Sequence, residues 1–205
     1  MERLAYFFDG FSIYHSLKRN SRYHKFMWLD YYNLAQIFTK KTQSIVSVTY
    51  FTSYSKWKPD SYKRHQIYVS ALRHTGVEPV FGNFKNKTIK CKICGGVSHK
   101  YHEEKETDVN IALAVLKGAL LNEFDTAIIS TADSDFIPVI RYLRNLSISK
   151  KVGILIPIGA SSKTRELQIE SDFYYKIKEK HLATCQLPDE IKIGTDTIAR
   201  PDEWK

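Results

Sequence analysis

Short apolar runs that are too brief to form helices alternate along this chain with longer segments of helical periodicity, and this alternation limits its fold more than any other feature. Residues 4–8 and 126–131 are the clearest runs, since they are rich in aromatic or β-branched side chains. Further strands are expected at 44–52, 78–84, 87–93 and 152–157, and helices at 11–18, 31–38, 59–74, 105–121 and 137–146. The repeated order of strand, helix and strand predicts an α/β fold in which helices cover both faces of a mainly parallel sheet.

Local signals mark several boundaries. Asp30 is expected to cap the second helix, and Pro59 lies at a plausible first turn of the third. Residues 166–180 have helical spacing, whereas 191–205 have no strong pattern. We therefore predict one domain over residues 1–190 followed by a C-terminal tail.

Size and composition agree with one globular domain. The chain has 205 residues, of which 43% are hydrophobic, and it contains no low-complexity tract. No apolar stretch approaches the ~20 residues that cross a bilayer, and the first strand begins without a signal-type segment. We expect a cytoplasmic protein without a membrane partner. The oligomeric state stays open, with a homodimer among the alternatives.

Four aspartates lie where an apolar segment gives way to a turn or to a helix start. Asp9 ends the first run, Asp133 and Asp135 follow the run at 126–131, and Asp108 opens the apolar stripe of the helix at 105–121. In open parallel sheets, ligands bind outside the carboxyl ends of the strands. We therefore expect these four carboxylates to share one pocket.

Such a pocket needs protons or cations. Two carboxylates about 4 Å apart repel by ~1 kcal/mol in water and by ~4 kcal/mol at an effective dielectric constant of about 20. Helix N-termini offset only about 0.3–1 kcal/mol each. Mg²⁺ and Mn²⁺ favour oxygen ligands, so the sequence predicts a site for one of them at these four aspartates. For any single aspartate, capping of a helix or turn is the simpler interpretation.

The chain is basic, with a net charge of +9 and an isoelectric point near 9.3. Basic residues gather, often near aromatic ones, at 56–58, 63–64, 85–92, 141–151 and 163–165. That mixture suits contact with phosphates together with stacking on bases. A solvated basic surface over an aromatic core is the alternative for any one cluster.

Two of the three cysteines form a Cys-x-x-Cys pair. Cys91 and Cys94 are followed by two glycines, which is half of a zinc-ribbon pattern. His99 and His102 could complete a four-ligand zinc site within an insertion at about 85–103, although the histidine spacing is tighter than usual. Free thiols in a reducing compartment, or a redox pair, are the alternatives. Cys185 is expected to be an isolated thiol.

Three segments, taken together and in order, resemble the motifs of NYN domains, which are PIN-like nucleases. These segments are FFDGFSIY at 7–14, EKETDVNIA at 104–112 and STADSDFIP at 130–138. The resemblance runs from about residue 3 to 190 and includes the Cys-x-x-Cys insertion. It implies a three-layer α/β/α sandwich around a mainly parallel sheet. It also implies RNA cleavage with Mg²⁺ or Mn²⁺ at the matching aspartates.

One position departs from the family pattern. Ser12 stands where family members commonly carry Asn three residues after the first Asp. Serine is shorter and lacks an amide donor, so positioning of a metal-bound water or of substrate is expected to be weaker there. An NYN domain that binds RNA but cleaves it weakly or not at all is therefore one alternative.

The function that we predict is metal-dependent hydrolysis of RNA phosphodiester bonds. Asp9 and Asp135 are expected to contact metal directly, and Asp108 and Asp133 directly or through water. The accessory groups expected around them are Glu104 and Glu106 as outer carboxylates and Ser12, Ser130 and Ser134 as groups that orient water or phosphate. A DNA nuclease and a protein-interaction domain with a structural ion are further alternatives.

Overall fold

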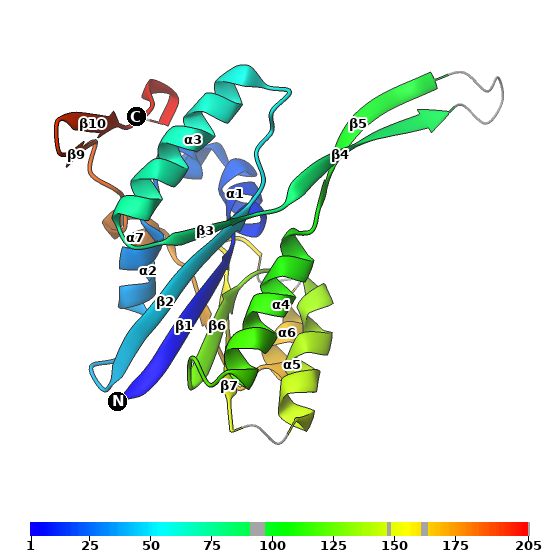
Figure 1. The fold of residues 1–205 in the computed structure, drawn as a ribbon, viewed down its shortest axis with the longest axis vertical. Helices are drawn as coiled ribbons and strands as arrows, with labels where there is room; N and C mark the ends of the chain where they lie inside the picture. Colours follow the sequence, from blue (N-terminus) through cyan, green and yellow to red (C-terminus); the bar gives the residue numbers. More distant parts are fainter. Residues whose placement is uncertain (91–96, 147–148, 161–163, 205) are drawn as a thin grey trace.

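The centre of the protein is a six-stranded sheet in which all neighbouring strands run parallel (Figure 1). The computed structural model describes residues 1–90, 97–146, 149–160 and 164–204, without the side chains of 89–100. The strands are β1 (Glu2–Asp9), β2 (Gln43–Thr52), β3 (Glu78–Phe81), β6 (Thr126–Ser130), β7 (Lys151–Ile156) and β8 (Phe173–Lys176). Their spatial order is β3-β2-β1-β6-β7-β8. The parallel sheet expected from the sequence is confirmed.

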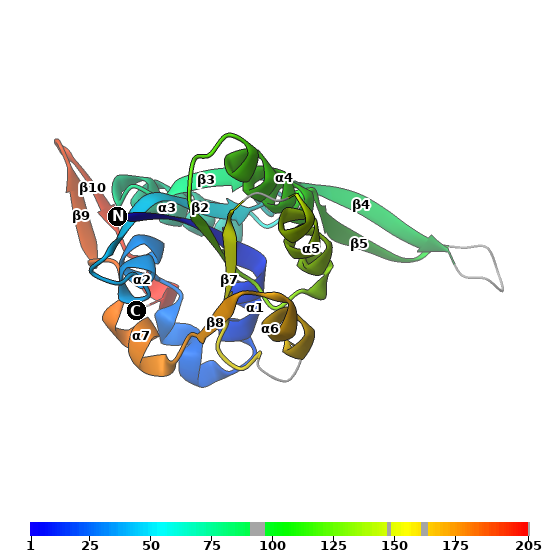
Figure 2. The same cartoon turned by 90° about the horizontal axis from the view of Figure 1, so that it is seen from below.

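Within the described residues, seven α-helices cover the two faces of this sheet (Figure 2). One face carries α1 (Gly10–Lys18), α2 (Tyr31–Ile37), α3 (Pro59–His74) and α7 (Glu179–Thr184), and the other carries α4 (Thr107–Leu120), α5 (Ile137–Asn145) and α6 (Arg165–Glu170). Successive side chains of β1 point to opposite faces of the sheet, and each face has its own hydrophobic core. Tyr6 and Phe8 pack with the first group of helices, whereas Ala5 and Phe7 pack with the second. Strands buried on both faces are hydrophobic throughout, as the run at 4–8 is.

The two helix starts that Asp30 and Pro59 marked in the sequence agree with the structure. Asp30 caps α2 through its carboxylate, which accepts hydrogen bonds from the backbone N–H groups of Tyr32 at 2.9 Å and Asn33 at 3.1 Å. Pro59 is the first residue of α3. In the part of the chain that is described, no helix is both long and apolar enough to cross a membrane.

The helix expected across 166–180 is wrong, because a strand divides it. β8 lies between α6 and α7 and pairs with β7. Phe173 and Tyr175 are half-buried while the residues between and after them are exposed, which is the period of two expected of a strand. The same apolar residues also fit helical spacing, and pairing with an exposed sheet edge decides between the two. The C-terminal residues, unassigned from sequence, form a small antiparallel hairpin of β9 (Glu190–Ile193) and β10 (Asp196–Ala199).

A second hairpin projects from the body of the protein as an arm (Figure 1). It consists of β4 (Asn83–Lys90) and β5 (Val97–Lys105), which pair antiparallel to each other and not with the main sheet. The strand expected at 78–84 therefore ends at Phe81, and the described part of the edge strand expected at 87–93, residues 87–90, belongs to this arm. Cys91, Cys94 and the side chain of His99 lie outside the described residues, so the zinc site stays a prediction.

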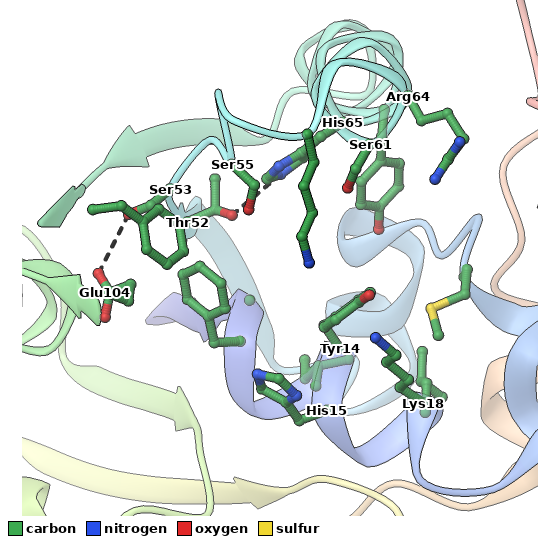
Figure 3. A pocket seen from close by; sticks show the side chains of 18 of the residues that line it. Tyr14, His15, Lys18, Thr52, Ser53, Ser55, Ser61, Arg64, His65 and Glu104 are labelled. Carbon is green, nitrogen blue, oxygen red and sulfur yellow. Dashed lines mark hydrogen bonds between the residues drawn. The ribbon is translucent and has the colours of Figure 1, made fainter. Parts of the chain in front are cut away.

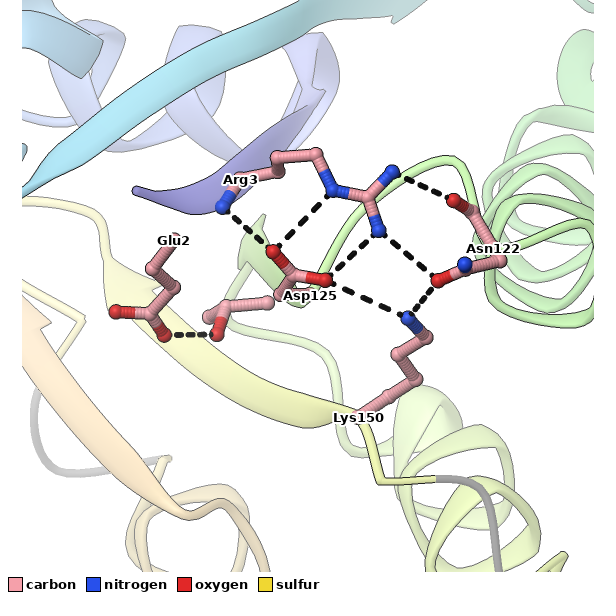
Figure 4. Close-up of polar contacts among 6 residues, drawn as sticks. Glu2, Arg3, Asn122, Asp125 and Lys150 are labelled. Carbon is pink, nitrogen blue, oxygen red and sulfur yellow. Dashed lines mark hydrogen bonds and ion pairs between the residues drawn. The ribbon is translucent and has the colours of Figure 1, made fainter.

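The amino ends of β1 and β6 are fixed to each other by an ion pair (Figure 4). Arg3 donates from Nη2 to Asp125 Oδ1 at 2.8 Å, and its backbone N–H donates to Asp125 Oδ2 at 2.8 Å. Asn122 accepts from the same guanidinium through its backbone carbonyl oxygen. These contacts set the register of the two central strands at the edge opposite to the one that carries Asp9.

Candidate active site

The strand order reverses between β1 and β6, and Asp9 lies there, joined by a hydrogen bond to the segment that follows β6. Asp9 ends β1 and caps α1, with 5% of its surface exposed. Its Oδ1 accepts a hydrogen bond from the backbone N–H of Ser12 at 3.0 Å. Its Oδ2 accepts one from Thr131 Oγ1 at 3.1 Å, just beyond the end of β6. In open α/β sheets such a reversal is where ligands bind.

The segment after β6 is held against the start of α1. Ser12 Oγ accepts a hydrogen bond from the backbone N–H of Ala132 at 3.0 Å. Thr131 Oγ1 accepts from the N–H of Asp133 at 3.1 Å, and Asp133 Oδ1 accepts from the N–H of Asp135 at 3.0 Å. A chain of hydrogen bonds therefore links the buried carboxylate of Asp9 to the exposed turn that carries the next two aspartates.

The capping role that we expected of single aspartates is also present. Asp9 caps α1, and Asp133 caps the short 3₁₀ helix η2 (Ser134–Phe136). Asp135 lies within that turn and Asp108 in the first turn of α4, and neither serves as the cap residue. Capping thus accounts for two of the four positions and leaves the two others to be explained.

Asp108 reaches the same edge from the other side. Glu106, just before α4, has a left-handed backbone with φ of 79°, which is uncommon for a residue with a side chain. Glu104 accepts hydrogen bonds at Oε1 from the N–H of Thr107 at 3.2 Å and from Ser53 Oγ at 3.3 Å. Glu106 accepts instead from Asn83 Nδ2 at 2.9 Å. These contacts hold the start of α4 against the base of the arm.

The carboxylates act on one another electrostatically. Burial raises the pKa of Asp9 to about 6, and repulsion from Asp108 adds to that rise while the hydrogen bonds from Ser12 and Thr131 oppose it. The pKa of Asp108 is also raised, first by loss of hydration and then by Asp133, Glu104 and Asp135. Asp108 is thus close enough to Asp9, Asp133 and Asp135 for its charge to interact with theirs.

The three serines predicted near the site have different surroundings. Ser12 is half-buried and joins α1 to the segment after β6, as described above. Ser134 is exposed in η2. Ser130 is buried, and its hydroxyl donates to the carbonyl oxygen of Leu155 at 3.1 Å, so it stabilises the sheet and is not presented at the edge.

A cavity of about 580 Å³ opens beside the acidic edge, and sequence reasoning did not find it. Gly10, Phe11 and Glu104 line it, so it begins directly after Asp9. Figure 3 shows Tyr14, His15 and Lys18 of α1 across the cavity from Ser61, Arg64 and His65 of α3. The sequence signals were the basic clusters at 56–58 and 63–64, because Trp57, Lys58 and Arg64 line the cavity. The other walls come from segments far apart in the sequence.

Comparison with known proteins identifies the family. The family pattern described as "NYN domain" matches residues 3–178. The chain belongs to the NYN domain family. NYN domains are a family of PIN-like nucleases, so the resemblance seen in the three motifs is confirmed at the level of the family.

Two individual proteins are similar to this NYN domain. One is 6-hydroxy-3-succinoylpyridine 3-monooxygenase of Pseudomonas putida, which is 26% identical and aligns with 98% of this chain and 75% of its own length. The other is a crystal structure of a protein of unknown function from Vibrio parahaemolyticus. It has a TM-score of 0.58 and 21% identity, and it covers 87% of this chain and 94% of its own. This second likeness supports the fold alone.

The acidic edge of this NYN domain fits a hard divalent cation by its donor atoms. NYN and PIN-like nucleases typically use Mg²⁺. Among the described residues, no three His, Cys, Asp or Glu side chains form a ready-made metal cage. Mg²⁺ seldom needs one, because it usually keeps several waters and binds through one or two carboxylates plus substrate phosphate. Burial raises the pKa values of Asp9 and Asp108, and repulsion between neighbouring carboxylates adds to the rise; a bound cation would oppose both effects.

Proposed function

We propose that this NYN domain is a metal-dependent ribonuclease that hydrolyses phosphodiester bonds at the edge formed by Asp9, Asp108, Asp133 and Asp135. The observation that carries the proposal is the buried Asp9 carboxylate, at the reversal of strand order, hydrogen-bonded to the segment that bears two further aspartates. Carboxylates whose pKa is raised by burial, with a further rise from a nearby charge, are typical of functional sites.

We assign each aspartate a role from its position in the site. Asp9 and Asp135 are assigned to direct contact with Mg²⁺ or Mn²⁺, and Asp108 and Asp133 to contact directly or through water. When bound, the ion supplies Lewis acidity and a lower pKa of water, so no protein nucleophile is needed. Asp9 is held in place by the hydrogen bonds from Ser12 and Thr131, and a fixed ligand loses less entropy when substrate binds.

Glu104 is assigned to an outer position, because its Oε1 already accepts hydrogen bonds from Thr107 and Ser53. Glu106 is likewise held by Asn83. Ser12 completes the site by tying the segment after β6 to α1, and it leaves its hydroxyl hydrogen available to water or a phosphate oxygen, since Oγ acts as the acceptor from Ala132.

RNA is the substrate that we favour, because the family is one of PIN-like nucleases and the net charge of +9 suits a polyanion. DNA as substrate is an alternative, and so is RNA binding without cleavage, for which Ser12 in place of Asn is the reason. Cleavage assays with matched labelled RNA and DNA strands in Mn²⁺ distinguish these outcomes.

The decisive experiment compares Asp135→Asn with Asp189→Asn, a change at an exposed aspartate far along the chain. With labelled RNA and Mn²⁺, Asp135→Asn is expected to abolish cleavage while Asp189→Asn retains it. Thermal stability of Asp135→Asn in EDTA is expected to equal or exceed that of the unmodified protein, since one repulsive charge is gone. Full cleavage by Asp135→Asn would reject the proposed site.

A second candidate function follows from the Pseudomonas putida relative, whose name describes oxidation of a substituted pyridine. The cavity lined by aromatic side chains favours it, because such a cavity could hold a small heteroaromatic compound. Monooxygenation also requires dioxygen and an electron donor. Mass spectrometry of 6-hydroxy-3-succinoylpyridine, incubated with the protein, air and a reduced nicotinamide or flavin, tests this candidate by the gain of one oxygen atom.

A further inference from the structure

Three exposed aromatic side chains converge on the cavity beside the acidic edge. Tyr14, Trp57 and Tyr101 are 39%, 36% and 37% exposed, and all three line it. They come from α1, from the segment before α3 and from β5, respectively. Exposed large aromatic groups that gather around one cavity mark a binding surface, whereas single ones elsewhere need no explanation.

Trp57 is held in a fixed orientation. Its ring stacks on the ring of His102, with centroids 3.6 Å apart and planes inclined by 10°. The ring of Phe84 forms a T-shaped contact with it, at a centroid distance of 4.6 Å. Because His102 and Phe84 belong to the arm, the arm base and Trp57 together form one wall of the cavity. An aromatic wall fixed before binding loses little entropy when a planar ring stacks on it.

The α1 side of the cavity carries Tyr14 and positive charge. The ammonium group of Lys18 lies 5.6 Å from the centre of the Tyr14 ring. Lys58 and Arg64 also line the cavity, and Arg64 is paired with Glu203 at 2.8 Å. Cations beside an aromatic surface suit a ligand that joins a planar ring to an anionic group.

Neutral polar groups of α3 and of the segment before it also line the cavity. His65 Nε2 lies 3.2 Å from Thr52 Oγ1, and burial lowers the pKa of His65 to about 4, so its ring is neutral at pH 7. The hydroxyls of Ser55 and Ser61 face the same space (Figure 3). Neutral donors and acceptors of this kind can hydrogen-bond the edge of a nucleobase without a charge of their own.

We propose that this cavity binds an unstacked nucleobase of the RNA strand whose backbone lies at the aspartates, and that the substrate is therefore single-stranded. This inference rests on the proposed nuclease function. The two sites are contiguous, because Gly10 and Phe11 line the cavity immediately after Asp9, and Glu104 lines it while acting on Asp108. A base in a duplex can enter only after it leaves its stack, which disfavours double-stranded RNA.

The test measures binding in EDTA, so that its result does not depend on cleavage. Titration calorimetry with adenosine 5′-monophosphate is compared with ribose 5-phosphate, which has the same phosphate and no ring. We expect the nucleotide to bind at least about tenfold more tightly, and Tyr14→Ala and Trp57→Ala each to weaken it by about fivefold or more. Tyr174→Ala, on the edge strand β8 and 44% exposed, is the matched control and should change nothing.

Two further ligands show whether the bound ring is a base of an RNA strand or belongs to a free small molecule. A short single-stranded oligoadenylate should bind more tightly than the mononucleotide and lose affinity by a similar factor in Tyr14→Ala, while an RNA duplex of equal length binds more weakly. Three outcomes would each overturn the proposal. They are binding of ribose 5-phosphate as tight as that of adenosine 5′-monophosphate, tighter binding of the free nucleotide than of the strand, and tighter binding of nicotinate than of either. A protein that binds the oligonucleotide in this way but does not cleave it would refute the nuclease function alone.

Discussion

At the scale of the residue, Asp9 holds a carboxylate where ionisation is unfavourable. It is buried and near Asp108, and hydrogen bonds from Ser12, Thr131 and the Phe11 backbone offset part of the loss of hydration. This unfavourable ionisation should affect the stability of the protein. A group whose pKa differs between the folded and unfolded states makes the free energy of unfolding depend on pH.

The folded-state pKa of Asp9 is about 6 against 3.8 for the ordinary group, so the folded protein holds its proton to higher pH. In EDTA, ionisation should therefore cost the folded state about 1 kcal/mol near pH 4.5 and about 3 kcal/mol near pH 7.5. Asp9→Asn keeps the cap and loses the charge. Its unfolding free energy relative to the unmodified protein should rise by about 2 kcal/mol between these pH values in urea titrations. A difference independent of pH would contradict the assignment.

At the scale of the element, the junction of β1 and α1 depends on Gly10. A Cβ atom at this position would lie 2.7 Å from the carbonyl oxygen of Phe51 in β2 and would also meet the Tyr50 ring. Backbone oxygen cannot move aside, so the glycine permits the close approach of α1 and β2 that positions Asp9. In the Asp-Gly pair at the end of the first strand, the glycine is thus needed for packing, whereas the aspartate is assigned a chemical role.

Gly10→Ala is expected to lower the unfolding free energy by about 1–3 kcal/mol, as overpacking does in a tight core. Urea denaturation followed by circular dichroism measures it. Ser134→Ala, an exposed change at the same edge, is the control and should alter stability by less than about 0.5 kcal/mol. If Gly10→Ala were as stable as Ser134→Ala, α1 would be able to move away from β2 without loss of unfolding free energy.

The ion pair of Arg3 and Asp125 joins two elements at the other edge of the sheet. Hydrogen bonds from Arg3 hold the pKa of Asp125 well below its usual range, so their contribution is present above about pH 4 and is lost as pH falls below it. Both side chains are more than a third exposed, and solvent screens the pair. Asp125→Ala should cost about 1 kcal/mol near pH 7 and less at low pH. Asp189→Ala, whose side chain is 72% exposed, should cost less in the same thermal melts.

At the scale of the whole molecule, the acidic edge exists within a chain of net charge +9. Under the proposed function the carboxylates would hold the metal and the basic surface would bind the polyanion, since phosphodiester cleavage requires both. Binding to RNA in EDTA should therefore weaken as salt rises, because counterions leave the strand when phosphates are contacted.

For about three phosphate contacts, the logarithm of the association constant should fall against the logarithm of salt with a slope of about −2. Fluorescence anisotropy of a labelled single strand measures it. An uncharged competitor of the same sequence, such as a peptide nucleic acid, should show almost no dependence on salt. A flat response for RNA would indicate that its phosphates are not bound, and it would favour the small-molecule function instead.

Local signals in the sequence determined the strand and helix alternation, the cap at Asp30, the start of α3 at Pro59 and the placement of acidic residues at strand ends. Periodicity and capping act within a few residues, so the sequence carries them directly. The tertiary structure alone decided the strand order, the division of 166–180 by β8, the separate arm and the cavity. These depend on pairing and packing between segments far apart in the chain, and two segments with the same local pattern can differ in which partner is available.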